Sequence, residues 1–249
     1  MTLYEKTWQA MRARVDAAAR CAGRDPAGVT LLPVSKGQPA MAIRGAYQVG
    51  TRAFGENYVQ EAVAKMDTLA DLAGIEWHLI GPLQGNKARA AASRFGWVQS
   101  VDRVAIAQRL SDARPNGSSA LNVCIQVNIS GEERKHGCIP DAALGLADEV
   151  ATLPRLALRG FMGIAQETGD AQRQRSQFAM LRALYERARG AGFDFDTLSM
   201  GMSADLEAAI AEGATLVRVG SALFGPRPQA ERDPRLSDTG DPRMDRTDA

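Results

Sequence analysis

The sequence predicts an α/β protein, a single (β/α)₈ TIM barrel, from three observations. Segments of strand and helix character alternate along almost the whole chain. Eight of the apolar segments have the length of strands, and eight is the number that closes a parallel barrel. The chain has 249 residues, 45% of them hydrophobic, which suits one barrel with a full core. We therefore expect one domain over residues 1–227.

The predicted strands are apolar segments separated by helical or turn sequence. They are 29–35, 52–54, 76–80, 97–99, 121–129, 156–164, 195–199 and 215–219. Pro33 is an irregularity in the first of them, because proline cannot donate to a strand ladder. We keep this segment as a strand.

Helical signals occupy the segments between these strands. In 57–70 apolar residues recur at i, i+4 and i+7, and in 170–190 at i, i+3 and i+7, which places each set on one helix face. The segment 203–212 has Ser203 as its expected N-cap and Gly213 as its expected stop.

The N-terminal segment predicts an extra helix outside the eight-fold repeat. Trp8, Met11, Val15 and Ala18 fall on one face of it. The unit after the last strand is short, so we expect this helix to cover the wall where an eighth helix would lie. An open doubly wound sheet is the main alternative, and the count of eight strands and the lack of a GxGxxG motif disfavour it.

Composition excludes several classes of function. Thirty basic residues balance 29 acidic ones without a basic block, so we expect no nucleic-acid partner and no anionic membrane. Three cysteines form no CxxC pair, and the N-terminus has no apolar signal region. These features predict a cytoplasmic protein. Residues 228–249 are polar and rich in Pro, Asp and Arg, and we expect them to form a disordered tail.

The most informative stretch is 198–225, in which two strands each run into a small-residue turn that opens a helix. Such turns expose backbone N–H groups at the positive end of the helix dipole. In a (β/α)₈ barrel the loops after the last two strands frequently hold phosphate. The stretch therefore predicts a phosphate cradle.

Lys36 is a candidate nucleophile at the end of the first predicted strand, one of only five lysines in the chain. Burial lowers the pKa of a lysine and makes a Schiff-base amine available. The alternative is a lysine that extends from the strand end to solvent. Together with a phosphate cradle, however, Lys36 matches the needs of pyridoxal 5′-phosphate (PLP), which has an aldehyde at one end and a phosphate at the other.

Arg218 lies two residues before Gly220, so alternation along the strand directs its side chain to the mouth of the barrel. Because arginine stays protonated, a bond to the pyridine nitrogen of PLP would leave that nitrogen unprotonated and the ring a weak electron sink. The equally weighted alternative is that Arg218 pairs with a carboxylate at the rim.

Other polar residues have simpler interpretations. His78 has no second metal ligand at suitable spacing, so we expect a packed histidine and no metal site. The charged loop 131–137 is expected to be solvated, with a lid that carries Lys135 as a secondary site for PLP as the alternative.

Eight short motifs in this order resemble the YggS/PROSC family of PLP-binding proteins, also called the PLP homeostasis proteins. They are VSKG (34–37), FGENYVQEAVAKM (54–66), EWHLIGPLQGNKAR (76–89), SVDR (100–103), VNISGEERKHG (127–137), LRGFMGI (158–164), LSMGMSADLEAAI (198–210) and VRVGSALFGPR (217–227). The resemblance runs from the N-terminal helix to Arg227. It implies a single barrel similar to the N-terminal domain of alanine racemase.

The resemblance also implies how the cofactor is held. Lys36 matches the lysine that carries PLP as an internal aldimine, and Arg218 matches the arginine that faces the pyridine nitrogen. Ser203, Gly220 and Ser221 match the positions that hold the phosphate.

Two further positions follow from the same comparison of motifs. Asn57 matches an asparagine beside the cofactor ring, and Met200 is expected in the same wall. Gln38 stands where the family commonly has a lysine, which removes a charge at the entrance of the site.

The function that the resemblance implies is intracellular PLP homeostasis, by storage or delivery of the cofactor, with an influence on amino-acid balance and no established turnover. PLP-dependent apo-enzymes would be the recipients. The alternative is an amino-acid racemase, which needs two opposed acid/base groups. In alanine racemase the second is a tyrosine from the partner's C-terminal domain, a domain that we expect to be absent here. Tyr58 is the one tyrosine expected near the site, and the lack of the partner's tyrosine favours a carrier. Since alanine racemase dimerises through the same C-terminal domain, we expect a monomer. A barrel for another phosphorylated metabolite would leave Lys36 without a role.

Overall fold

Eight parallel strands form the centre of the molecule. The computed structural model describes residues 2–227, and the predicted tail of 228–249 lies outside the described residues. The strands are β1 (Thr30–Pro33), β2 (Ala53–Glu56), β3 (Glu76–Leu79), β4 (Trp97–Val101), β5 (Leu121–Val127), β6 (Leu156–Gly163), β7 (Thr197–Ser199) and β8 (Leu216–Val219). All eight predicted strands are confirmed, including β1 with Pro33 at its last position.

The strands close into a ring. Their order is β1-β8-β7-β6-β5-β4-β3-β2, so that each strand neighbours those before and after it in the chain. Val34 and Gly55 join the two ends of the sheet by a parallel bridge, and Ser35 donates its backbone N–H to the carbonyl of Gly55 over 2.9 Å. The sheet is therefore a barrel, and the alternative of an open doubly wound sheet is wrong.

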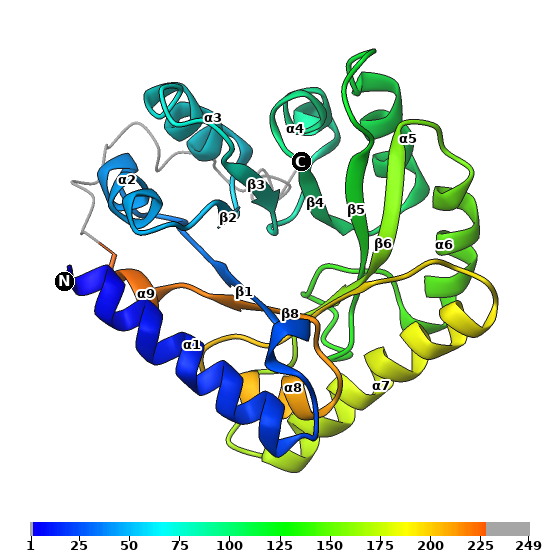
Figure 1. The fold of residues 1–249 in the computed structure, drawn as a ribbon. Helices are drawn as coiled ribbons and strands as arrows, with labels where there is room; N and C mark the ends of the chain where they lie inside the picture. Colours follow the sequence, from blue (N-terminus) through cyan, green and yellow to red (C-terminus); the bar gives the residue numbers. More distant parts are fainter. Residues whose placement is uncertain (1, 228–249) are drawn as a thin grey trace, which may run out of the picture.

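Helices surround this ring, as Figure 1 shows. They are α1 (Leu3–Cys21), α2 (Ala40–Gln48), α3 (Val59–Thr68), α4 (Ala88–Arg94), α5 (Val104–Ala113), α6 (Ala143–Ala151), α7 (Ala171–Gly190), α8 (Leu206–Ala211) and α9 (Ser221–Phe224). Short 3₁₀ turns lie at Pro26–Gly28, Gly85–Lys87 and Pro140–Ala142. The apolar face of each long helix packs on the outside of the barrel, and these contacts form the main core.

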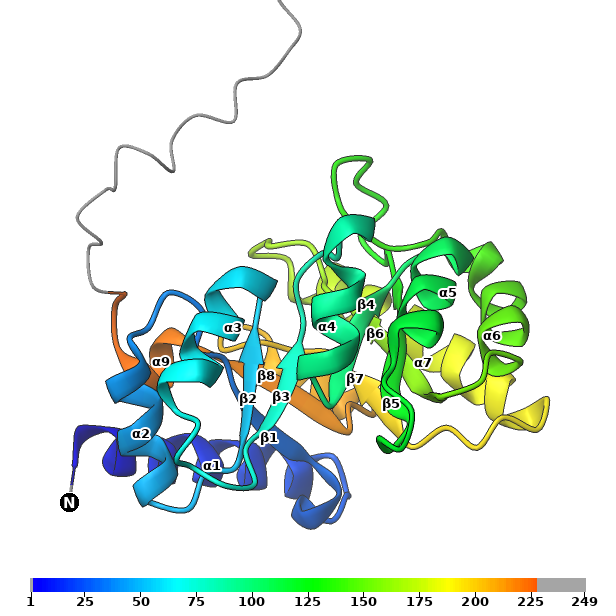
Figure 2. The ribbon, with the colours of Figure 1, turned by 90° about the horizontal axis from the view of Figure 1, so that it is seen from above.

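Helix α1 stands where the last helix of the repeat would be. Thr2 and Glu5 form a capping box at its start, and Met11, Val15 and Ala19 are buried. Figures 1 and 2 both show α1 beside the short α9, and α1 also packs on α8. Because α9 has only four residues, α1 supplies the apolar cover that the eighth unit lacks. The predicted place of this helix is confirmed.

Helix α8 begins later than the sequence predicts. Its N-cap is Asp205, and the expectation of Ser203 at that place is wrong. The carboxylate of Asp205 accepts a 2.6 Å hydrogen bond from the backbone N–H of Met202, and the N–H of Asp205 donates to the carbonyl of Met202. This turn holds residues 202–205 outside the helix, which leaves Ser203 in the loop. The predicted stop at Gly213 is confirmed by its φ of +97°.

A chain of polar side chains crosses the inside of the barrel. Arg218 donates to the hydroxyl of Ser199 over 2.5 Å, and Ser199 donates to the amide oxygen of Gln99 over 2.6 Å. The amide nitrogen of Gln99 lies 3.0 Å from Nδ1 of His78, whose Nε2 lies 2.9 Å from Glu76. The amide must be the donor in its bond, so His78 accepts at Nδ1 and donates from Nε2.

This arrangement gives His78 and Gln99 hydrogen-bond partners in the barrel centre. His78 and Gln99 are 3% and 0% exposed, and unpaired polar atoms at that depth would each cost about 1–3 kcal/mol. The ring of His78 also stacks on Trp97, with 5.1 Å between centroids. His78 is thus a packed, hydrogen-bonded histidine, as the sequence suggested.

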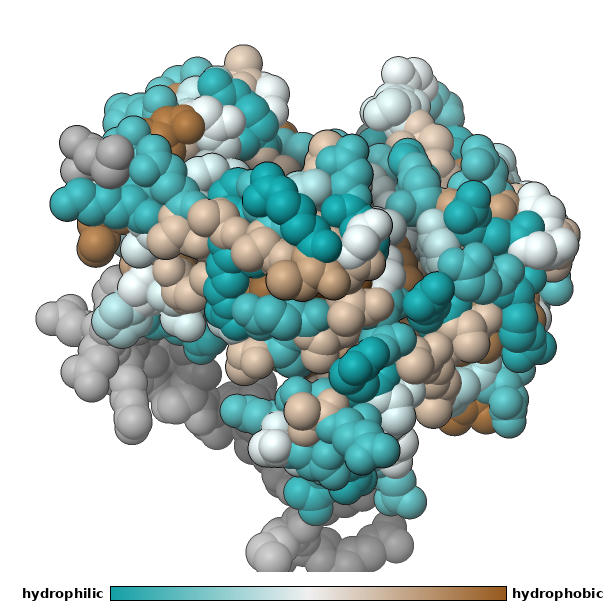
Figure 3. Space-filling view, turned by 60° about the horizontal axis from the view of Figure 1, so that its bottom comes forward, coloured by the Kyte–Doolittle hydropathy of each residue, from teal (hydrophilic) through white to brown (hydrophobic). Residues whose placement is uncertain are grey.

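The surface is mainly polar. On the face that Figure 3 shows, strongly hydrophobic residues are scattered rather than gathered into one patch. The large hydrophobic side chains that are exposed in the described part of the chain are Leu3, Met41, Tyr58, Ile139, Met180 and Met202. Within residues 2–227, no helix has the length and apolar character that crossing a bilayer requires.

Gly160 offers a test of the contact between β6 and β7. Its φ is +148°, and a Cβ placed there would lie 1.9 Å from the carbonyl oxygen of Thr197. We expect Gly160→Ala to lower the free energy of unfolding by about 3 kcal/mol or more, measured by urea denaturation. Gly145→Ala in α6 is the matched control, because no atom would lie near its Cβ, and it should raise stability by about 0.5–1 kcal/mol. Equal effects of the two changes would contradict this account.

His78 predicts a pH dependence of stability. Burial lowers its pKa below the ordinary value of 6.5, while Glu76 opposes this shift. The unfolded chain therefore binds a proton at a pH where the folded protein does not, so stability should fall as pH drops below about 6.5. We expect the difference in free energy of unfolding between about pH 7.5 and 5.5 to be smaller in His78→Gln. If His78→Gln leaves this pH dependence of the free energy of unfolding unchanged, His78 does not cause it.

Candidate functional site

The carboxyl ends of β1, β2, β7 and β8 bring the predicted site residues to one mouth of the barrel. Lys36 follows β1, and Asn57 follows β2 directly. Arg218 lies within β8, and Gly220 and Ser221 come just after it. Since β1 pairs with both β8 and β2, these residues belong to adjoining parts of the rim.

Alternation along β1 directs Lys36 into the mouth. Leu32 and Val34 both approach Gly55 on the face that points into the barrel, each about 3.4 Å from where a Cβ would stand. Lys36 continues this face two residues later. Ser35 lies on the opposite face, where its hydroxyl reaches Glu56.

The surroundings of Lys36 lower the pKa of its amine. The residue is half-buried, and burial lowers the pKa of its amine below the ordinary value. The positive charges of Arg227 and Arg218 lower this pKa further, whereas Glu61 raises it. A neutral amine is a nucleophile, so the environment of Lys36 favours covalent chemistry.

Arg218 is buried without a carboxylate partner among the described residues. Its guanidinium donates to the hydroxyl of Ser199 and, over 2.9 Å, to the carbonyl of Gly163. The alternative of an ion pair at the rim is therefore wrong. Burial lowers the pKa of Arg218 to about 10, which leaves it charged at neutral pH.

The loops after β7 and β8 lie side by side. The N–H of Arg218 donates to the carbonyl of Gly201 over 3.0 Å, which ties the two loops together. Ser203 is half-buried in the first loop, and Gly220 and Ser221 open α9 in the second. The first N–H groups of a helix have no acceptor within it, and they are available to an anion.

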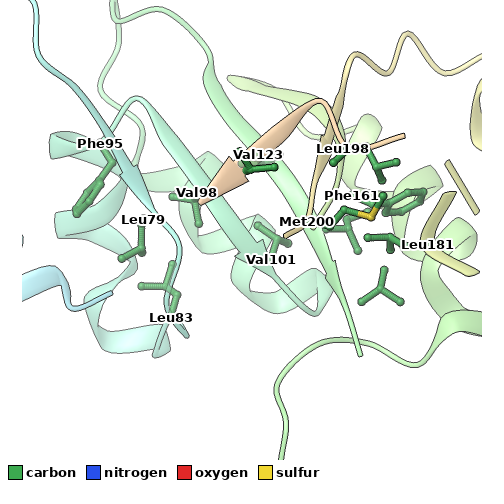
Figure 4. Close-up of a cluster of buried hydrophobic side chains, with 14 of the residues drawn as sticks. Leu79, Leu83, Phe95, Val98, Val101, Val123, Phe161, Leu181, Leu198 and Met200 are labelled. Carbon is green, nitrogen blue, oxygen red and sulfur yellow. The ribbon is translucent and has the colours of Figure 1, made fainter. Parts of the chain in front are cut away.

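Met200 departs from the expectation of a residue in the wall of the mouth. Its side chain is fully buried, and Figure 4 shows it among Phe161, Leu181 and Leu198. Ser199 takes the inward position at the end of β7, so its neighbours turn toward α7. The side chain of Met200 therefore belongs to the core between the barrel and its helices, and it supports the loop from behind.

Asn57 lines two cavities next to the mouth. One is about 340 Å³ and also touches Tyr58, and the other is about 200 Å³ and reaches the loop 131–137. In that loop Lys135 is engaged within the protein, 2.6 Å from Glu132 and 3.2 Å from the carbonyl of Ala165. Asn57 and Tyr58 thus line a cavity on the same side of the barrel as the end of β2, and Lys135 has local partners.

The sequence reasoning missed four charged residues close to the site. Arg227 lies against Gly37, with its Cδ 2.9 Å from where a Cβ of that glycine would stand. Glu61, Lys65 and Glu56 form a cluster behind Lys36. The spacing of Glu61 and Lys65, i and i+4 on one helix, was a signal in the sequence. Within residues 2–227, no group of three or more His, Cys, Asp or Glu side chains is arranged to hold a metal ion.

Comparison with protein families gives a match over almost the whole described chain. Residues 7–228 match the family model described as "Alanine racemase, N-terminal domain". A Pseudomonas aeruginosa protein named pyridoxal phosphate homeostasis protein is 56% identical over 215 residues, which cover 86% of this chain and 92% of that protein. An Escherichia coli protein of the same name is 46% identical over 224 residues, 89% and 96% of the two chains.

Solved structures agree with this match. PipY of Synechococcus elongatus with PLP bound has a TM-score of 0.74 and 39% identity, and the match covers 86% of this chain and all of PipY. An alanine racemase from Clostridium difficile shares the fold, with a TM-score of 0.65 at 13% identity over 81% of this chain and 53% of the racemase. The match to the family model and this degree of identity over most of both chains lead to one conclusion: the chain belongs to the family of pyridoxal phosphate homeostasis proteins.

Proposed function

We propose that this protein binds PLP at the mouth of the barrel and serves PLP homeostasis, by storing the cofactor or handing it over. The proposal rests on three features that lie together at one mouth of the barrel. These are the activated amine of Lys36, the unpaired charge of Arg218 and the joined loops after β7 and β8.

The residues fit the chemistry of the cofactor. PLP brings an aldehyde that forms a Schiff base with a lysine, a phosphate and a pyridine ring. Lys36, as a neutral amine, would give up both of its protons, which leave with the aldehyde oxygen as water. Ser203, Gly220 and Ser221 would hold the phosphate with hydroxyl and backbone N–H groups.

Arg218 and Asn57 would hold the ring. The bonds from Arg218 to Ser199 and Gly163 fix its guanidinium without neutralising it, which leaves a donor for the pyridine nitrogen. Asn57 lies at the end of β2 beside the mouth cavities. In this assignment Met200 would not contact the cofactor with its side chain. It would support the loop after β7 by packing in the core.

The proposal names a carrier rather than an enzyme. Proton transfer on both faces of a bound amino acid needs two opposed acid/base groups. Tyr58 is the tyrosine that lines a mouth cavity in the described chain, and it is 63% exposed. Arg218 in place of an acid at the pyridine nitrogen weakens the ring as an electron sink. The relatives, too, are named as homeostasis proteins. Exchange of the α-proton of an amino acid for deuterium would reveal racemase-like activity.

Location, assembly and recipients form part of the same proposal. The three cysteines are free, which suits a reducing compartment such as the cytoplasm. We expect a monomer, to be measured by light scattering, and PLP-dependent apo-enzymes as recipients. Transfer is tested by mixing the PLP-loaded protein with such an apo-enzyme and following the gain of the recipient's activity against free PLP.

Covalent attachment at Lys36 is directly testable. We expect added PLP to give a visible absorption band, and borohydride reduction followed by peptide mapping to place the label on Lys36. Lys36→Ala should lose the band, because the change removes the amine that would form the Schiff base. Its circular dichroism should stay that of the folded barrel, since the side chain is not part of the core.

Lys135→Ala and Lys87→Ala are the matched controls, and both should keep the band and the label. Label on Lys135 in the unmodified protein would overturn the assignment of the site. A protein that gains no band at any PLP concentration would overturn the proposed function as a whole.

A further inference from the structure

Behind Lys36 lies a second lysine with a different environment. Lys65 in α3 has a side chain that is only 8% exposed. Its ammonium lies 2.7 Å from the carbonyl oxygen of Ser35, 2.7 Å from Glu56 and 2.6 Å from Glu61. An ammonium has three N–H donors, so all of them are used.

This cluster holds the chain on both sides of Lys36. Ser35 accepts from Lys65 with its carbonyl and donates with its hydroxyl to Glu56 over 2.6 Å. Gly37 donates its N–H to Glu61 over 2.6 Å. The residues immediately before and after Lys36 are therefore fixed to β2 and α3 through Glu56, Glu61 and the ammonium of Lys65, which binds both carboxylates.

The chain turns at Gly37, directly after Lys36. Its φ of +69° belongs to the left-handed region, and the exposed turn that it forms leads away from the barrel toward α2. Without the bond to Glu61, the N–H of Gly37 would lose its acceptor, and the turn after Lys36 would keep only the bonds that Gln38 makes to the carbonyls of Ser35 and Gly225. The direction of the Lys36 side chain depends on both sides.

A contribution to the stability of the fold does not by itself explain why Lys65, Glu56 and Glu61 are clustered here. Glu56 is 0% exposed, and its Oε2 has no hydrogen-bond partner among the described residues. Burial raises the pKa of Glu56, and Lys65 opposes that shift. Buried ion pairs of this kind often stabilise a fold no better than apolar residues of the same size, so a structural role in placing neighbouring groups is the better account.

Lys65 is unsuited to act as the reactive amine itself. It lies on the outer face of the strand ends, with Ser35, whereas Lys36 continues the face that points into the barrel. Its three donors are all engaged, so an attack on an aldehyde would first require three hydrogen bonds to break. The two lysines therefore have separate roles.

We propose that Lys65 is a positioning residue, which with Glu56 and Glu61 fixes the end of β1 so that the amine of Lys36 is presented to PLP in one orientation. The proposal rests on the proposed function, since it concerns how that site is built. A misplacement of about 1 Å can slow a reaction by about a hundredfold, so the loss of this support should be visible in the rate of attachment.

The test compares attachment rates in the full-length protein. Lys65→Met keeps the length of the side chain and removes all three bonds. We expect the visible band to form about 10–100-fold more slowly with added PLP, while label after reduction remains on Lys36. Lys6→Met, an exposed lysine in α1, is the matched control and should leave the rate unchanged.

Glu61→Gln separates positioning from charge. The amide keeps an oxygen that can accept from Gly37 and Lys65, so the maximal rate should stay near that of the unmodified protein. Because Glu61 raises the pKa of Lys36, its neutralisation should move the midpoint of the pH–rate profile to lower pH. A purely structural role of the cluster would not move this midpoint.

A double variant keeps the proposal testable if Lys65→Met alone does not fold. Lys65→Met alone leaves Glu56 buried without its partner, and Lys65→Met combined with Glu56→Gln removes that charge. We expect this double variant to keep the circular dichroism of the folded protein and to attach PLP as slowly as Lys65→Met.

The outcomes separate the two proposals. An unmodified protein that never attaches PLP would overturn the proposed function. Normal attachment in the unmodified protein together with an unchanged rate in Lys65→Met would overturn the positioning role alone. Loss of the folded state in both Lys65 variants would assign the cluster to stability and would also overturn it.

Discussion

The closure of the parallel ring between β1 and β2 is the constraint on which the rest of the structure depends. The bridge between Val34 and Gly55 brings the first strand, already paired with β8, against the second. Only in a closed ring do residues that follow the two end strands of this order, such as Lys36 after β1 and Asn57 after β2, lie at one side of the same mouth. Gly55 permits this closure, because Leu32, Val34 and Ile80 fill the space where its side chain would stand.

The interior of this ring is organised by polar groups as well as by apolar packing. The chain from Arg218 through Ser199, Gln99 and His78 to Glu76 links five polar side chains by hydrogen bonds. Its consequence for the site is that Arg218 is held by neutral groups and keeps its charge. A carboxylate in place of Ser199 would have neutralised the group that the cofactor ring would meet.

Two lysines that lie close in the fold illustrate how environment decides chemistry. Lys36 is half-buried on the inner face, where burial and two arginines lower its pKa. Lys65 is buried on the outer face with two carboxylates and a carbonyl. The first environment lowers the pKa of its amine, and the second holds its amine by three hydrogen bonds. Residue type is the same in both, so the difference comes from what surrounds each amine.

The sequence by itself determined the eight strands, the covering helix α1 and the residues at the strand ends, because these follow from local periodicity and from parallel strands ending at one edge. It also contained the motifs of the family. The start of α8 at Asp205, the outward turn of Met200 and the cluster behind Lys36 were decided only by the tertiary structure. Each depends on contacts between segments distant in the chain or on which face a side chain takes in the loop, and local patterns do not encode these. The network that holds Lys36 joins β1, β2 and α3, so it exists only once the barrel has closed.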